Sequence, residues 1–352
     1  MSGAMMPEEW PIAAPAADGN APARLAGRGR LATVRRDFFL DAAKRLTEQE
    51  RALMTAMLHC LVGDVAAAVR AALPKGRVAA NDESDAALIQ ALTASGLLDE
   101  AGLMALLLRR ADEERIASAA RARSGRREAR VLQGLVSHDY GAVAAAAMAL
   151  ILGRGRRRDR FGQCLVAFDD LPGASAESLV HAVAAGLRRE LAAAHGAPAA
   201  DEELWAASEQ VIENHDEERS IEALTAALVH FLDEAGGLSD DLVLAAANEG
   251  EVGFVAEFLA RRAAIPTDSA MDELLSGEPS HVMALLRMAG APRELGAGLL
   301  ASIGDLLGIG DPGAAITLFD RMSEQEVQAA RAWLTTAGAY RAALERLGQG
   351  RG

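Results

Sequence analysis

The stretch Val255-Ala-Glu-Phe-Leu-Ala-Arg-Arg-Ala-Ala-Ile-Pro266 is echoed by His281-Val-Met-Ala-Leu-Leu-Arg-Met-Ala-Gly-Ala-Pro292. Leucines stand at the same place in both stretches, at Leu259 and Leu285, and both stretches end at proline. A repeat of this length is typical of stacked helical units, each of which buries its apolar face against the next unit. The echo therefore predicts an α-solenoid, a fold that offers a long surface to partners.

The composition also favours helices. Hydrophobic residues make up 51% of the chain but aromatic residues only 4%, so most of the apolar content is alanine and leucine. These two residues are strong helix formers, and we find no run of alternating apolar and polar residues bounded by turn signals, as a sheet requires. We therefore expect an all-α protein.

Capping boxes predict helix starts near both ends of the chain, at Thr47-Glu48-Gln49-Glu50 and at Ser323-Glu324-Gln325-Glu326. The first helix is expected to end at Gly63, with the next beginning at Asp64. Further helices are predicted over residues 88–92, 98–108, 131–136, 143–152 and 179–191, because glycine, proline and serine breaks separate these apolar stretches.

The segment from Leu61 to Leu73 resembles the second helix of a HEAT repeat, where an acidic residue, here Asp64, opens the helix and a Val-Arg pair, here Val69-Arg70, follows. From Thr47 onward, the order of elements is similar to that of an uncharacterised alphaproteobacterial family of HEAT-like helical proteins, a domain of unknown function. The resemblance implies an all-α fold, a HEAT-like α-solenoid of stacked antiparallel helix pairs. It implies no catalytic residue.

Three regions are predicted along the chain. Residues 1–30 combine prolines and glycines without apolar periodicity and are expected to be a disordered N-terminal tail. Residues 31–195 form a HEAT-like helical half that carries arginine-rich clusters, and residues 196–352 form an acidic helical-repeat half. We place the boundary at His195-Gly-Ala-Pro-Ala-Ala200, where glycine and proline separate two periodic segments.

The two halves differ in charge. Residues 1–195 carry 26 basic and 23 acidic side chains, whereas residues 196–352 carry 10 and 27. Locally, residues 109–160 hold 13 arginines against six acidic residues, and residues 201–257 hold one arginine against 16 acidic residues. Such segregation predicts surfaces for partners of opposite sign, or for each other.

The arginines are the candidate partner-binding residues: Arg121, Arg123, Arg126, Arg127, Arg130, Arg154, Arg156, Arg157, Arg158 and Arg160. Three interpretations stay open. The clusters bind an acidic surface, either of a protein partner or of the chain's own second half; they bind nucleic acid or phosphate; or they form a solvated face. We favour a non-enzymatic scaffold or regulator that binds a protein, with nucleic acid as the alternative, since few aromatic residues accompany the arginines.

Motifs for enzymatic chemistry are missing from the sequence. Gly308-Ile-Gly310-Asp-Pro-Gly313 has dinucleotide-loop spacing, but it follows a helical run, so we expect a helix–helix loop with Asp311 as N-cap. No catalytic residue, cofactor or metal site is predicted. Cys60 and Cys164 are expected to be buried thiols. No secretory signal pattern and no membrane-spanning run is recognised, which predicts a cytoplasmic protein.

Overall fold

The computed structural model describes residues 46–74, 82–125 and 130–347. The chain divides into two units, Met1–Thr47 and Glu48–Gly352, and every helix described below belongs to the second unit. The predicted tail at residues 1–30, the first residues of the predicted helical half from residue 31 to residue 45, and the candidates Arg126 and Arg127 lie outside the described residues.

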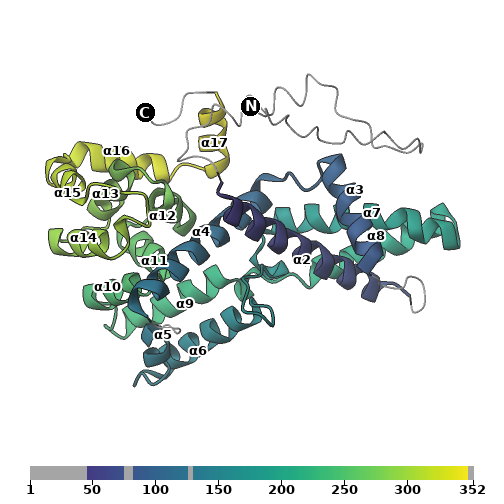
Figure 1. Ribbon diagram of the computed structural model, residues 1–352, viewed down its shortest axis with the longest axis horizontal. Coiled ribbons are helices and arrows are strands. Elements are labelled where there is room, and N and C mark those ends of the chain that lie inside the picture. The colour runs from purple at the N-terminus through teal and green to yellow at the C-terminus, as the bar shows by residue number, and fades with distance from the viewer. Residues whose placement is uncertain (1–45, 75–81, 126–129, 348–352) are drawn as a thin grey trace, which may run out of the picture. The chain divides into compact units, whose positions relative to one another are not determined.

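The regular secondary structure of the described residues is helical, apart from one antiparallel bridge between Arg158 and Cys164 (Figure 1). The all-α prediction is confirmed for these residues. The helices are α2 (Glu48–Ala72), α3 (Asp82–Ser95), α4 (Ala101–Ser124), α5 (Arg130–Leu135), α6 (Gly141–Arg156), α7 (Gly173–His195), α8 (Ala197–Glu213), α9 (Ile221–Glu234), α10 (Asp240–Asn248), α11 (Val252–Ala263), α12 (Thr267–Leu275), α13 (Pro279–Met288), α14 (Arg293–Leu299), α15 (Pro312–Arg321), α16 (Glu324–Leu334) and α17 (Gly338–Arg346).

Helix α2 is continuous through Gly63, so the prediction that a helix ends there is wrong. Glycine costs a helix interior only about 1 kcal/mol relative to alanine, and the buried stripe continues on both sides of it, from Met57 and Leu61 to Val65 and Val69. That stripe packs against α4, α7 and α8. Since Asp64 lies inside α2, the acidic residue of the HEAT resemblance does not open a helix here.

By length and composition alone, α2 is also apolar enough to cross a membrane, and it is the one such helix found among the described residues. Its buried residues face other helices of the same unit, as those of a protein core helix do. The prediction that the chain has no membrane span stays a prediction.

Helices that are distant in sequence pack together around α2 and α4. Helix α2 contacts α7 and α8, and α4 contacts both α2 and α11, so α4 links the α2–α3–α7–α8 group to the later helices (Figure 1). The predicted boundary falls at Gly196, which has φ +83° and forms the turn of the α7–α8 hairpin. These two helices pack along each other within one compact unit. The division into halves at residue 195 stays a prediction.

The two repeated stretches of sequence also share the same backbone geometry at their ends. Helix α11 is followed by Ala264, with φ +53°, and α13 is followed by Ala289 and then by Gly290, with φ +60°, at the position that corresponds to Ala264. In both places the amide of the next residue donates to a carbonyl five residues earlier, from Ile265 N to Ala260 O at 3.1 Å and from Ala291 N to Leu286 O at 3.0 Å. These are the hydrogen bonds of a Schellman C-cap.

Helices α11 and α13 form the centre of the core. In α11, Phe254, Phe258 and Leu259 are almost fully buried, and α13 buries Leu285 to the same degree. A helix that is apolar on nearly all sides belongs inside a protein. The two helices contact each other, and both leucines of the repeat, Leu259 and Leu285, are buried.

The helix ends confirm two predicted caps. Ser323 Oγ accepts from the amide of Glu326 at 3.3 Å, and the Glu326 carboxylate accepts from Ser323 N at 2.7 Å, which is the predicted capping box of α16. Asp311 caps α15, because its side chain accepts from Ala314 N at 2.9 Å. The Gly308–Gly313 segment is therefore a helix–helix loop.

Candidate functional site

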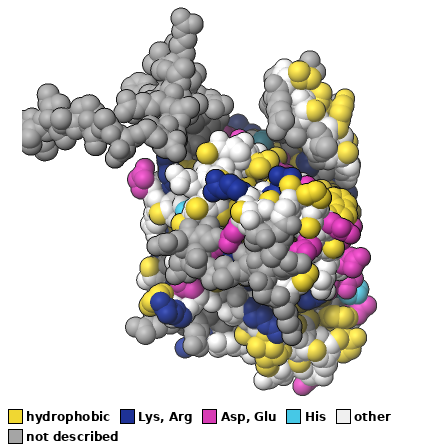
Figure 2. Space-filling view, turned by 90° about the vertical axis from the view of Figure 1, so that its right-hand side faces the viewer, with side chains coloured by type: hydrophobic (Ala, Val, Ile, Leu, Met, Phe, Trp, Pro, Cys, Tyr) yellow, Lys and Arg dark blue, Asp and Glu magenta, His cyan; other side chains and the backbone are white. Residues whose placement is uncertain are grey.

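The described candidate arginines lie on four elements. Arg121 and Arg123 are in the last turn of α4, Arg130 begins α5, Arg154 and Arg156 end α6, and Arg157, Arg158 and Arg160 follow in the next loop. On the face shown in Figure 2, basic side chains form separate patches among acidic and hydrophobic ones.

The loop after α6 is a tight hairpin from Arg157 to Leu165. Leu165 N donates to Arg157 O at 2.9 Å, and Asp159 N donates to Gln163 O at 3.0 Å. At the tip, Asp159 Oδ1 accepts from the amides of Phe161 and Gln163, both at 2.8 Å. Short polar side chains such as aspartate stabilise turns in this way, and the hairpin holds its tip in a defined shape.

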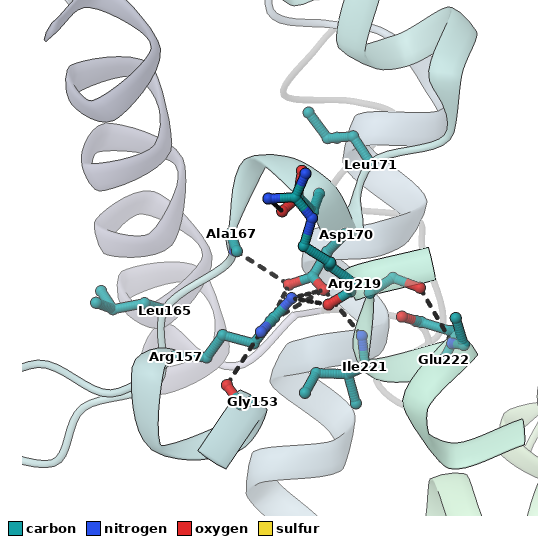
Figure 3. A network of polar contacts seen from close by, with 12 residues as sticks. Gly153, Arg157, Leu165, Ala167, Asp170, Leu171, Arg219, Ile221 and Glu222 are labelled. Carbon is teal, nitrogen blue, oxygen red and sulfur yellow. Dashed lines mark hydrogen bonds and ion pairs between the residues drawn. The ribbon is translucent and has the colours of Figure 1, made fainter. Parts of the chain in front are cut away.

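Arg157 lies at the base of this hairpin and is buried (Figure 3). Its Nε and Nη2 donate to both oxygens of Asp170, with distances between 2.7 and 3.0 Å, and its Nη1 donates to Gly153 O at 3.0 Å. Nη2 also donates to Arg219 O at 2.9 Å. The guanidinium therefore serves the fold, and it is not available to a partner.

Asp170 completes this network from a 3₁₀ turn at Phe168–Asp170. Its carboxylate also accepts from Ala167 N at 3.0 Å and from Ile221 N, at the start of α9, at 3.1 Å. Burial alone would raise the pKa of Asp170, but the hydrogen bonds from Arg157 and the charges of Arg110 and Arg157 lower it. The network joins the end of α6, the 3₁₀ turn and the first turn of α9.

Ion pairs connect the arginine-rich region with the acidic region. Arg110 donates to both carboxylate oxygens of Glu222, at 2.9 and 2.7 Å, and Arg154 pairs with Glu251. Arg109 lies 3.6 Å from the same Glu222 carboxylate. The two oppositely charged regions thus meet inside the molecule. These ion pairs agree with the interpretation that the arginines bind the acidic region of the same chain.

Glu114 of α4 is shared by two candidate arginines. Its Oε1 accepts from Arg121 and its Oε2 from Arg158, both at 2.7 Å. Burial would raise the pKa of Glu114, but the hydrogen bond from Arg158 and the charges of Arg158 and Arg121 lower it. The glutamate therefore stays ionised and joins the hairpin to α4.

These side chains surround a cavity of about 240 Å³ between α4, the end of α6, the hairpin, α9 and the first turn of α11. Five arginines and three glutamates line it, namely Arg110, Arg121, Arg154, Arg157, Arg158, Glu113, Glu114 and Glu251, together with the half-buried Cys164. Burial, with a smaller contribution from the charge of Glu114, raises the pKa of the Cys164 thiol to about 11. The thiol is neutral and a poor nucleophile at neutral pH.

Other candidates lie away from this cavity. Arg123 donates to Ser302 O at 3.0 Å and pairs with Asp305 at 2.6 Å, and the Arg130 amide donates to Glu249 at 3.0 Å. Arg156 and Arg160 are exposed, and neither has an ion pair to another described residue. The Arg160 guanidinium stacks instead over Phe161, 4.8 Å from the ring centroid.

The sequence predictions for the cysteines and for metal sites concern residues outside the arginine clusters. Cys60 is exposed, so the prediction that it is buried is wrong: it lies on the side of α2 away from the apolar stripe. Among the described residues there is no group of three or more histidine, cysteine, aspartate or glutamate side chains arranged to hold a metal ion. Sequence reasoning missed Asp170 and Glu222, whose roles depend on arginines from other helices.

Comparison with known families matches residues 90–332 to a family described as an uncharacterised protein conserved in bacteria, DUF2336. The match includes the cavity, the hairpin and the echoed helices α11 and α13. Searches of curated proteins and of solved structures found no match to this chain. Because the matched region spans more than half of the sequence, the chain belongs to the DUF2336 family of bacterial proteins.

Proposed function

We propose that this chain is a non-enzymatic helical adaptor that binds a protein partner through the tip of the hairpin that follows α6. One observation carries the proposal: 80% of Phe161 is exposed at this tip, although the hairpin backbone is fixed by hydrogen bonds. A large apolar side chain held in water by a defined backbone is a typical interface anchor, since aromatic residues supply much of the binding energy at interfaces.

The outer face of α6, the helix that leads into the hairpin, also carries exposed apolar side chains. Ala145, Met148, Leu152 and Arg156 follow one another at intervals of three or four residues and all are exposed. Residues at this spacing share one side of a helix. The stripe is apolar until its last member, Arg156, which has no ion pair to another described residue.

The chemistry of this surface selects the partner. Phe161, Met148 and Leu152 favour apolar side chains, while Arg156 and Arg160 favour carboxylates. We therefore infer a partner segment that carries both, such as an amphipathic helix with an acidic flank. The contacts of α9 with α11, and of α11 with α13 and α13 with α15, support a HEAT-like solenoid as the framework for such a surface.

The test compares two exposed aromatic residues. Phe161→Ser removes the hairpin anchor, and Trp205→Ser is the matched control, because Trp205 is 61% exposed on α8, where it stacks on His181. Each tagged full-length variant is used to capture partners from a lysate of the source cell, with and without nuclease. Binding of the recovered proteins is then measured with purified components.

The proposal expects a nuclease-resistant protein that binds wild type and Trp205→Ser equally and binds Phe161→Ser roughly 30-fold more weakly, as is typical for a hot-spot residue. Equal binding to Phe161→Ser and wild type would contradict it. If nuclease treatment abolishes the capture of partners, the result would favour the nucleic-acid alternative instead.

A further inference from the structure

The cavity between α4, the hairpin and α11 has a surplus of cationic lining. Five guanidinium groups face three carboxylates, and Glu114 alone serves both Arg121 and Arg158. Arg157 is paired with Asp170, which does not line this cavity, and Arg110 is paired both with Glu222 outside the lining and with Glu113 inside it. The lining itself therefore holds two more guanidinium groups than carboxylates.

A buried donor in this wall lacks an acceptor. Arg110 exposes only 4% of its surface, and its Nε has no hydrogen-bond partner among the described residues. More than nine-tenths of buried polar groups in proteins are satisfied, so this guanidinium N–H is a donor for which the described residues supply no acceptor. A ligand oxygen would supply it.

The first turn of α11 adds donors from the backbone. Val252 and Gly253 line the cavity at the start of this helix, which is 12 residues long. The Val252 amide already donates to Gly250 O at 2.9 Å, so the Gly253 amide is the donor offered here. The side chain of the N-cap residue, Glu251, does not cap the helix, because it pairs with Arg154 instead. The first amides of a helix have no intrahelical acceptor, and the helix dipole favours an anion beside them.

The size of the cavity limits the ligand. At about 240 Å³ it is smaller than the roughly 300–1,000 Å³ of sites for drug-sized molecules. Cys164 adds no negative charge, since its thiol stays protonated at neutral pH. The cavity has room for a compact oxyanion or a small ester of one, and its guanidinium donors suit an anion.

We propose that this cavity binds a phosphate group, as a free ion or as a small phosphomonoester, and that the Glu251 carboxylate occupies Arg154 until the phosphate replaces it. Guanidinium groups bind phosphate through pairs of charge-assisted hydrogen bonds. The site is separate from the hairpin tip, so it does not depend on the proposed protein partner.

The test is titration of the full-length chain with inorganic phosphate at constant ionic strength, followed by calorimetry and by the melting temperature, with chloride as reference. Phenyl phosphate is a second probe, and tighter binding of one probe tells the free ion from the ester. The wild type is expected to bind saturably and to melt at a higher temperature with phosphate.

Two variants have opposite expected effects. Glu251→Gln removes the competing carboxylate and should tighten phosphate binding, whereas Arg154→Gln should weaken it by about tenfold or more. Arg156→Gln, outside the cavity on the same helix, is the matched control and should bind as wild type does. Glu251→Gln is expected to bind phosphate more tightly. A folding defect would weaken binding, so it would not produce the same result.

Absence of saturable binding to the wild type would overturn the proposal. Equal weakening by Arg154→Gln and Arg156→Gln, or weaker binding by Glu251→Gln, would overturn it as well. Phe161→Ser should keep phosphate binding, so failure of this proposal and failure of the proposed partner site are distinguished.

Discussion

The Arg157 guanidinium and the Asp170 carboxylate form a buried ion pair with two-pronged geometry, 13 residues apart in sequence, at the point where α6, the hairpin and α9 meet. Asp170 is fully covered and Arg157 nearly so. Removing one partner of such a pair leaves an uncompensated buried charge, which costs far more than the loss of a surface ion pair. The two neighbouring arginines, Arg156 and Arg157, therefore have different roles.

Arg157→Ser should lower the free energy of unfolding by about 3 to 5 kcal/mol, because it strands the Asp170 carboxylate. Arg156→Ser should change it by no more than about 0.5 kcal/mol, because Arg156 is exposed. Chemical denaturation of both variants measures the difference. Equal stability of the two variants would show that the buried pair contributes little.

Acid should destabilise the protein through the same carboxylate. The pKa of Asp170 lies below its ordinary value of 3.8 in the folded state: burial opposes ionisation, but Arg157 and Arg110 outweigh burial. The unfolded chain then takes up a proton at higher pH than the folded chain does. The stabilisation is therefore complete above about pH 4 and is lost as pH falls through the folded-state pKa.

Denaturation midpoints measured at pH 6, 4 and 3 test this expectation. The wild type should lose stability most steeply below pH 4, and Asp170→Asn, less stable at pH 6, should show a shallower slope there. An unchanged slope in Asp170→Asn would assign the acid sensitivity to other carboxylates.

The core helix α13 gives a third prediction. Leu285→Ala should cost roughly 2 to 5 kcal/mol, because Leu285 is fully buried and the substitution leaves a cavity. Leu152→Ala is the matched control on another helix: 54% of Leu152 is exposed, so the cost should stay within about 0.5 kcal/mol. A melting point unmoved by Leu285→Ala would contradict the placement of α13 in the core.

The C-caps of α11 and α13 give a fourth prediction, in which substitutions at the two equivalent positions change stability in opposite directions. Ala264 has a left-handed backbone that costs a residue with a Cβ about 1 kcal/mol or more, so Ala264→Gly should stabilise by up to about 1 kcal/mol. Gly290→Ala should destabilise by a similar amount, since a Cβ there meets open space and only the backbone strain counts. Shifts of the same sign in thermal melts would contradict the equivalence of the two caps.

Local patterns predicted the fold well where they were short-ranged. The repeat that places Leu259 and Leu285 at equivalent positions located two core helices, because each stretch carries its own apolar pattern within one helix. The capping box at Ser323 located a helix start, because it depends on residues only a few positions apart. The break predicted at Gly63 failed for the opposite reason. Packing of α2 against α4, α7 and α8 outweighs the helix penalty of one glycine, and that packing is not visible in the local sequence.

The candidate site was predicted only in part. The arginine clusters were recognised, and Arg121, Arg154, Arg157 and Arg158 do meet around one cavity. Their partners were missed, because Glu222 follows Arg110 by 112 residues and acidic residues on helices are most often solvated. The Pro-Gly pair after Asp170 marks a turn, but nothing in the sequence tells which charge that turn buries.

The central claim is that Phe161 at the hairpin tip anchors a protein partner. The most direct test is the dissociation constant of the recovered partner for wild type, Phe161→Ser and Trp205→Ser, each purified at full length and checked for unchanged melting. The account predicts a roughly 30-fold weaker complex for Phe161→Ser and an unchanged one for Trp205→Ser. The same dissociation constant for all three proteins would contradict it.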